Sequence, residues 1–361
     1  MTWVWADVVR VAPILVFLLS ITVVAELADA AGVFESAASL ASRQGGGSVL
    51  RLWLLLVGLA AGCTILLSLD TTAVLLTPVV LTVARHLGLR PWPFALATVW
   101  LANTASLLLP VSNLTNLLLV DQLGWSVATY VGRMWLPALV SLVVSVLLLL
   151  LLVRRSLGGR YDHPEPPVPH DVVLFRTALV VCLLLGPAFV LGIPPWIVGC
   201  VAALVLVLVF ARRSPGVLRL GLVPWQLVVT TLALFLVVGL LEQHGLTTWL
   251  TAVAGTASDG PVALLRTAFV GAAASNLVNN LPAYVALEPV AASSPDRLLA
   301  LLLGTNLGPL ITLWGSLATL LWRDRCRSGG LEVGAGRFAL AGVVGVPVLL
   351  LTTTLALWLT P

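Results

Sequence analysis

The residues of this sequence that could do chemistry are polar side chains set inside long apolar runs. Asp70 is the only acid well inside such a run, and Ser68, Thr71 and Thr72 lie beside it. A polar or charged group at the middle of a bilayer is costly, so it normally faces a cavity, a partner or a substrate. We therefore expect Asp70 to contact a transported solute or ion. A buried structural acid is the alternative.

A second polar pair, Asn279 and Asn280, interrupts another apolar run roughly 200 residues downstream, and a proline follows each pair at Pro78 and Pro289. Downstream of each pair, an Asn–Ser–Thr pattern recurs in the two sets Asn103, Ser112, Thr115 and Asn306, Ser316, Thr319. Because proline and dense polar residues interrupt membrane helices, these patterns indicate broken helices whose freed backbone groups need partners. The candidate substrate or ion contacts are Asp70, Thr71, Asn103, Thr104, Ser112, Asn113, Asn279, Asn280, Asn306, Ser316 and Thr319.

Each uncharged member of this set also has a plainer explanation. Ser, Thr and Asn inside membrane helices often only hydrogen-bond a neighbouring helix, which contributes about 0.6 kcal/mol each. The recurrence of the two sets in both halves of the chain favours a shared site over isolated interhelical contacts.

Composition restricts the elements that can position these residues. Of the 361 residues, 60% are hydrophobic and 9% are charged, and the mean hydropathy is +1.09. Soluble domains carry about 25% charged residues, so this chain is not a cytosolic enzyme, a nucleic-acid binder or a disordered protein. Its apolar runs of roughly 17–25 residues predict membrane-spanning helices. We expect an all-α polytopic membrane protein.

Two of the predicted elements are re-entrant hairpins. The run 72–84 would be only about 20 Å long as a helix, which is short for a complete span, so a hairpin is favoured over two spans joined by a turn. The first copy of the pattern starts from the cytoplasmic side of the membrane and the second copy starts from the outer side. The two halves therefore form an inverted repeat, as in many secondary transporters. The chain is predicted to divide into a first repeat (1–153), connecting spans (154–225) and a second repeat (226–361). The first repeat contains hairpin 50–85 and broken helix 94–120. The second repeat contains hairpin 262–290 and broken helix 298–322.

The basic residues, all arginine, orient the chain because they are enriched in short cytoplasmic loops. If the loop after the first run (Val11–Leu27) is cytoplasmic, only four of the 19 basic residues face outside. Those four are Arg10, Arg133, Arg266 and Arg297. Since this orientation puts Ala28–Ala30 inside, we expect the first run to be a span and not a cleaved signal peptide.

At these motifs the chain resembles the arsenite and antimonite efflux permeases of the ion transporter superfamily. The resemblance runs from about Pro13 to the C-terminus and is carried by Asp70 before Leu75–Pro78, by Asn103–Leu107, Val111–Leu114, Ser275–Pro282, Leu307–Pro309 and Gly315–Trp322. It implies an inverted-repeat ion transporter fold with eight spanning helices, two hairpins and two broken helices. It also implies export of trivalent arsenic or antimony by alternating access, with proton antiport as the energy source.

The chain departs from the family pattern at charged positions. Leu69 replaces an asparagine, Asn103 and Asn306 each replace an aspartate, and Leu310 replaces a lysine. Replacing Asp by Asn keeps most hydrogen bonds but removes a titratable proton carrier. Asp70 would then be the remaining proton- or cation-linked residue. Family members also carry an N-terminal segment with further spans, and this sequence begins near what resembles their third span.

The expected cargo is compatible with a neutral polar site, because arsenous acid is an uncharged trihydroxide that amide and hydroxyl groups can bind. Two alternatives stay open: a sodium- or proton-coupled carrier of organic anions or another oxyanion, and a scaffold that does not transport. We predict no enzymatic activity, no cofactor, no metal ligands and no nucleic-acid partner. The expected partners are arsenite or antimonite, a coupling proton or sodium ion, and the lipid bilayer of the bacterial inner membrane. The resemblance also allows a homodimer and a cytoplasmic ATPase partner.

Overall fold

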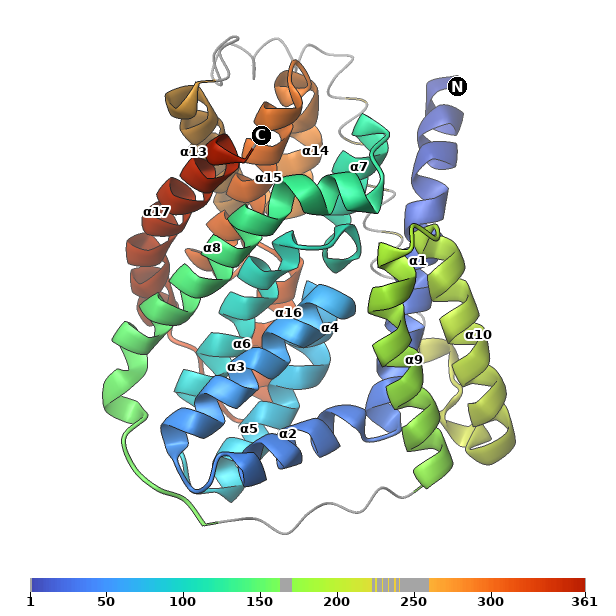
Figure 1. Cartoon of the computed structure of the whole chain (residues 1–361), viewed down its shortest axis with the longest axis vertical. Coiled ribbons are helices and arrows are strands. Elements are labelled where there is room, and N and C mark those ends of the chain that lie inside the picture. Colours follow the sequence, from blue (N-terminus) through green and yellow to red (C-terminus); the bar gives the residue numbers. More distant parts are fainter. Residues whose placement is uncertain are drawn as a thin grey trace.

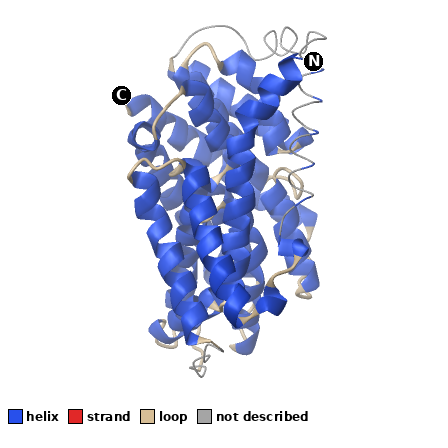
Figure 2. Cartoon of the chain, turned by 90° about the vertical axis from the view of Figure 1, so that its right-hand side faces the viewer, coloured by secondary structure: helices blue, strands red, loops and turns tan. Residues whose placement is uncertain are grey.

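The computed structural model describes residues 2–162, 171–222, 225, 229, 233, 237, 240 and 260–360. Within these residues the regular elements are helices, and seven of those helices are long and apolar enough to cross a membrane. They stand side by side along the long axis of the molecule (Figures 1 and 2). The predicted span 226–241 lies almost wholly outside the described residues. The all-α polytopic architecture is confirmed.

The first half begins with α1 (Thr2–Ala30) and α2 (Val33–Gln44), the latter lying across the lower end in Figure 1. Hairpin 1 consists of α3 (Val49–Leu66), α4 (Leu69–Thr71), the π-helix η1 (Thr72–Leu76) and α5 (Thr77–His86). Broken helix 1 consists of α6 (Trp92–Thr104), the 3₁₀ turns η2 (Ala105–Leu107) and η3 (Pro110–Ser112), and α7 (Leu114–Leu123). The long helix α8 (Val127–Val153) and the turn η4 (Arg154–Ser156) follow.

The connecting part contains α9 (Val172–Val190), α10 (Pro195–Arg213) and the turns η5 (Pro215–Val217) and η6 (Leu220–Leu222). Hairpin 2 consists of α13 (Pro261–Val278) and α14 (Asn280–Ala291). Broken helix 2 consists of α15 (Pro295–Leu307), η7 (Gly308–Leu310) and α16 (Leu317–Ser328), and α17 (Ala335–Leu359) ends the fold.

The two halves match element by element. The first hairpin arms, α3 and α13, have 18 residues each, and the first segments of the broken helices, α6 and α15, have 13 residues each. Hairpin 1 enters from the lower end of the molecule and hairpin 2 from the upper end (Figure 1). Both hairpins and both broken helices are therefore present in opposite orientations, as the inverted repeat requires.

Small residues bring the second-half helices into close contact. A Cβ atom on Gly304 of α15 would lie 2.1 Å from the carbonyl oxygen of Ala268 in α13. Similarly, a Cβ atom on Gly342 of α17 would lie 2.0 Å from the Leu310 carbonyl oxygen. Backbones touch at both positions, which is how membrane helices gain dispersion contacts without a hydrophobic driving force. This packing holds hairpin 2, broken helix 2 and α17 together.

A peripheral bundle of α1, α9 and α10 stands beside this core, on the right in Figure 1. Helix α1 packs along α10 and also contacts α9, and the Phe17 and Phe189 rings meet edge to face with centroids 6.0 Å apart. Toward the core, α1 contacts η1 of hairpin 1 and α7 of broken helix 1. Helix α9 also contacts α2, α3 and α8, so the two packed parts of the molecule meet along both α1 and α9.

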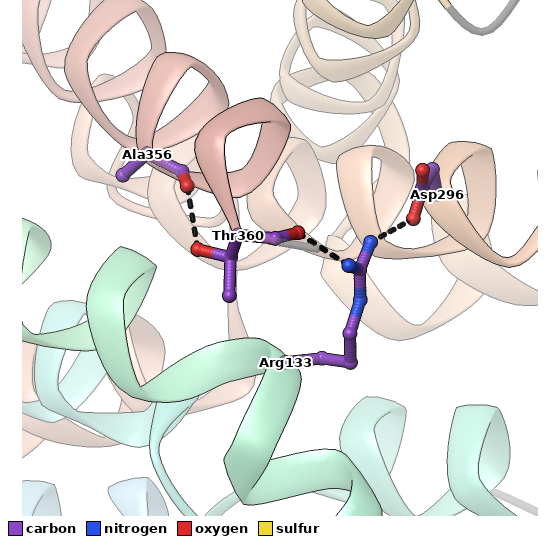
Figure 3. Close-up of polar contacts among 4 residues, drawn as sticks. All are labelled: Arg133, Asp296, Ala356 and Thr360. Atoms are coloured by element: carbon purple, nitrogen blue, oxygen red, sulfur yellow. Dashed lines mark hydrogen bonds and ion pairs between the residues drawn. The ribbon is translucent and has the colours of Figure 1, made fainter.

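Arg133, one of the four arginines expected outside, is held by protein groups (Figure 3). Its guanidinium nitrogens donate to the Asp296 carboxylate at the start of α15 and to the Thr360 carbonyl oxygen after α17. The Thr360 hydroxyl in turn donates to the Ala356 carbonyl oxygen at 2.7 Å. This contact explains why a cation is retained at the end of the molecule where the arginine bias predicts few.

Candidate functional site

Both hairpin tips have an unusual backbone conformation. Ser68 has φ 151° and ψ 166°, and Asn279 has φ 96° and ψ 154°. Among the described residues these are the only non-glycine residues with positive φ. This region of backbone space costs an L-residue about 1–3 kcal/mol, and such strain concentrates at functional sites. The matched strain shows that the tips are equivalent, which makes Leu281 the structural counterpart of Asp70 and Asn280 the counterpart of Leu69.

The breaks in the two broken helices are also equivalent. Asn113 is the N-cap of α7, and its side-chain oxygen accepts the Thr115 N–H at 3.3 Å. Ser316 is the N-cap of α16 and accepts the Thr319 N–H at 3.1 Å. Asn113 therefore corresponds to Ser316, whereas the sequence pattern paired Ser112 with Ser316. The difference arises because the extended backbone conformation fixes the cap position, and either residue type can fill it.

Four helix N-termini converge on one small cavity between the two halves. Its volume is about 30 Å³, enough for one or two water molecules. The first residues of α4 and α14 in the two hairpins and of α7 and α16 in the two broken helices line it, and α1 contributes one more side chain. The lining is Leu18, Leu69, Asp70, Asn113, Leu114, Asn280, Leu281, Leu317 and Ala318. Helix N-termini present N–H groups and partial positive charge, so the cavity favours electronegative ligand atoms.

Asp70 is the only charged residue in this lining. It lies in the first turn of the second arm of hairpin 1, where a helix N-terminus stabilises a carboxylate. Its Oδ1 atom is buried and has no hydrogen-bond partner among the described residues. Asp70 therefore keeps an acceptor available to a proton, a cation or a solute hydroxyl.

Asn280 completes the polar lining from the opposite tip. It is 5% exposed and is the first residue of α14. The N-terminus of α14 has no side-chain cap, whereas side chains of Ser68, Asn113 and Ser316 cap the other three helices. The side-chain amide of Asn280 and the backbone N–H groups of Asn280 and Leu281 can bind oxygen atoms, whereas Pro282 has no N–H and the Ala283 N–H donates to the Asn279 carbonyl oxygen.

Asn306 makes three side-chain hydrogen bonds to the other half of the molecule. Its side-chain oxygen accepts from Asn113 Nδ2 at 3.0 Å and from Thr115 Oγ1 at 2.9 Å, and its Nδ2 donates to Asn116 Oδ1 at 3.0 Å. All of these partners belong to broken helix 1, so this network joins the two halves. Asn306 does not line the cavity.

Asn103 makes the related contact from the first half. Its Nδ2 donates to the Val99 carbonyl oxygen at 2.9 Å and reaches Thr319 Oγ1 in broken helix 2 at 3.5 Å. Its Oδ1 is buried and has no partner among the described residues. Asn103 and Asn306 thus each reach from one broken helix to the other. Both amide atoms of Asn306 are hydrogen-bonded there, whereas Asn103 Oδ1 is not.

The remaining candidates hold the backbone in place. Thr71 bonds to the Ser68 side chain, and Ser112 Oγ donates to the Ile65 carbonyl oxygen at 2.8 Å, which ties the first break to the end of α3. Thr104 Oγ1 donates to the Trp100 carbonyl oxygen within its own helix. Asn279 Nδ2 donates to the Trp314 carbonyl oxygen at 2.9 Å. None of these four residues lines the cavity, and their part in binding stays a prediction.

Asn276 organises the second break and was not singled out in the sequence. Its Oδ1 accepts from both the N–H and the hydroxyl of Thr312, its Nδ2 donates to the Gly308 carbonyl oxygen, and its own carbonyl accepts Trp314 Nε1. One side chain therefore closes the loop between η7 and α16. The signal was present, because Asn276 lies one turn before the Asn279–Asn280 pair inside the same apolar run. Among the described residues, no three His, Cys, Asp or Glu side chains are placed to hold a metal ion.

Comparison with known proteins identifies relatives over most of the chain. A family model described as a citrate transporter matches residues 8–296. The arsenical pump membrane protein of Escherichia coli K12 is 32% identical over 361 residues, covering 92% of this chain and 83% of that protein. The protein of the same name from Yersinia enterocolitica is 33% identical with the same coverage. The crystal structure of the YdaH transporter from Alcanivorax borkumensis has the same fold, with a TM-score of 0.61 and 15% identity over 99% of this chain and 86% of that chain.

Proposed function

We propose a function from one premise: the chain belongs to the citrate transporter family and is a multi-pass bacterial cell-membrane transporter related to the arsenical pump membrane proteins. The function proposed is export of arsenite or antimonite in exchange for protons, by alternating access. The observation that carries this proposal is the cavity where Asp70 and Asn280 meet four helix N-termini.

The chemistry of the cavity suits a small, neutral oxygen compound. Arsenous acid presents three hydroxyl groups, each able to donate and accept a hydrogen bond. The amides of Asn113 and Asn280 can do both, and the helix N-termini bind oxygen atoms without adding a full charge. No basic side chain lines the cavity. A neutral cargo therefore needs no counter-charge that would have to be desolvated.

Asp70 is proposed as the proton carrier. Asn103, Asn306 and Leu310 are uncharged, so in this site the Asp70 carboxylate is the group that can take up and release a proton. If arsenite and the proton bind at Asp70 in turn, the transporter carries arsenite out of the cell when the site turns outward. It then carries a proton into the cell when the site turns back inward. Exchange of one proton per arsenite follows from a single carboxylate.

Access to the cavity is proposed to change along the contact between the core and α1. Leu18 of α1 covers the cavity, so moving the core relative to the α1, α9 and α10 bundle would uncover it. A second cavity of about 490 Å³ lies between the end of α1, α2 and α5, at the end that the arginine bias makes cytoplasmic. Asp29, Glu35 and His86 line it, and this polar lining supports the proposal that water and cargo enter from the cytoplasm at this end.

An alternative function is cation-coupled transport of an organic anion, which the description of the matching family model favours. Carboxylates also bind helix N-termini. Because no cation lines the cavity, a multiply charged anion would require bound sodium ions or protons for neutralisation.

Everted membrane vesicles test the two functions directly. We expect wild-type vesicles to accumulate radiolabelled arsenite when respiration acidifies their interior. A protonophore should abolish accumulation, as should Asp70→Asn. Asp324→Asn, which changes an exposed acid at the end of α16, is the matched control and should accumulate arsenite normally. Sodium-driven uptake of citrate or succinate without arsenite transport would establish the alternative and contradict the proposal.

A further inference from the structure

A long apolar groove separates α9 and α10 on the surface of the peripheral bundle. Its volume is about 600 Å³. Several of its lining side chains are exposed, among them Val180 and Leu184 of α9 and Val201 of α10, at 53%, 59% and 56%. In a membrane protein such a groove faces the acyl chains of the bilayer.

One end of the groove carries a cation. Arg176 lines the groove in the second turn of α9 and is the only charged residue of that helix. It is exposed and lies within the apolar span Val172–Phe189. An exposed arginine in an apolar span is costly unless its guanidinium reaches the lipid headgroups or finds an anion.

The described protein groups near Arg176 supply no such anion. Asp171, at the start of the same helix, accepts Arg213 Nε at 2.7 Å and caps the Val173 and Leu174 N–H groups. No acid lines the groove, and within the described ranges no ion pair of Arg176 is found. Arg176 is therefore left without an ion-pair partner among the described residues.

The length of the groove matches a lipid chain. Along α9 its lining runs from Arg176 to Ala188, which corresponds to about 18 Å at 1.5 Å per residue. One leaflet contributes about half of a 30 Å hydrocarbon core. A chain whose headgroup rests at Arg176 would thus lie in the groove for its whole length.

We propose that this groove binds one anionic phospholipid of the cytoplasmic leaflet, with its phosphate on Arg176 and one acyl chain between α9 and α10. The charge of Arg176 selects the headgroup and the apolar lining holds the chain. The lipid would anchor the peripheral bundle in the bilayer at a site separate from the transport cavity.

Native mass spectrometry of the purified protein tests this site with phosphatidylglycerol and phosphatidylcholine of matched chains. We expect one tightly held phosphatidylglycerol, preferred about fivefold over phosphatidylcholine. Arg176→Gln should remove the preference, and Arg176→Lys should keep most of it. Arg155→Gln, at an exposed position after α8, is the charge control and should bind as wild type does.

A second variant tests the acyl-chain part of the site. Ala188→Phe should fill the groove and lower the occupancy of both lipids, while Val143→Phe, on the exposed face of α8, should not. The proposal is overturned if Arg176→Gln keeps the phosphatidylglycerol preference or if Arg155→Gln loses it equally. It is also overturned if the groove is occupied by a second copy of the chain, seen as a dimer that Ala188→Phe dissociates.

Discussion

At the scale of single residues, similar amides have different surroundings. Asn280 lines the cavity and lies at an uncapped helix N-terminus, whereas the amide of Asn306 is hydrogen-bonded to three side chains of broken helix 1. From the sequence, Asn280 and Asn306 both belong to the candidate contact residues, because each interrupts an apolar run at a position where the other half of the chain has a similar polar residue. The sequence could not tell them apart, because the partners of Asn306 are almost two hundred positions away along the chain.

Asn280→Ala should lower arsenite transport strongly while leaving protein stability nearly unchanged. The side chain faces the cavity, so its loss removes a ligand group and leaves no protein group unpaired. Initial rates of arsenite uptake should fall at least tenfold, and the thermal unfolding midpoint in detergent should match that of the wild type. An unchanged rate would show that this amide is not a ligand.

Asn306→Ala, in contrast, should clearly lower protein stability. It removes the hydrogen bonds that Asn306 makes with Asn113 Nδ2, Thr115 Oγ1 and Asn116 Oδ1, and each buried polar group left unpaired costs about 1–3 kcal/mol. We expect a clearly lower unfolding midpoint. Thr352→Ala, which removes only a hydroxyl bonded within α17, should leave the midpoint in place. Equal midpoints for the two variants would contradict the network.

At the scale of elements, the hairpins and broken helices follow from polar pairs and prolines within apolar runs. The predicted bounds lie within three residues of the observed ones, except that broken helix 2 continues six residues beyond the predicted end at 322, to Ser328. The pairing of Ser112 with Ser316 was wrong by one position, since the cap depends on backbone geometry. The role of Asn276 also depends on folding, because its partners lie in the break of another helix.

The contact between α13 and α15 gives a prediction for packing. Gly304→Ala should destabilise the protein by about 1–3 kcal/mol, because the new methyl group must displace the Ala268 backbone. Gly58→Ala, in α3, meets no atom within 4 Å and should be neutral or slightly stabilising. The unfolding midpoints of the two purified variants make the comparison. A tolerated Gly304→Ala would mean that the helices lie further apart.

At the scale of the whole molecule, the cavity lies where two inverted halves meet and where α1 covers them. The halves were predictable from their repeated patterns and from the arginine bias. The size of the cavity and its cover by Leu18 were not, because they depend on how the peripheral bundle packs against the core. A cavity of about 30 Å³ must widen before it can hold a trihydroxide, and the proposed function places that motion between these two parts.

Proton movement driven by arsenite is the most direct measurement of the central claim. Purified protein is reconstituted into liposomes that contain a pH-sensitive dye, and arsenite is added outside without an imposed pH gradient. We predict that arsenite influx drives protons out and raises the internal pH, and that Asp70→Asn abolishes this change while Asp324→Asn preserves it. Arsenite influx without proton movement, or an undiminished pH change in Asp70→Asn, would contradict exchange through Asp70.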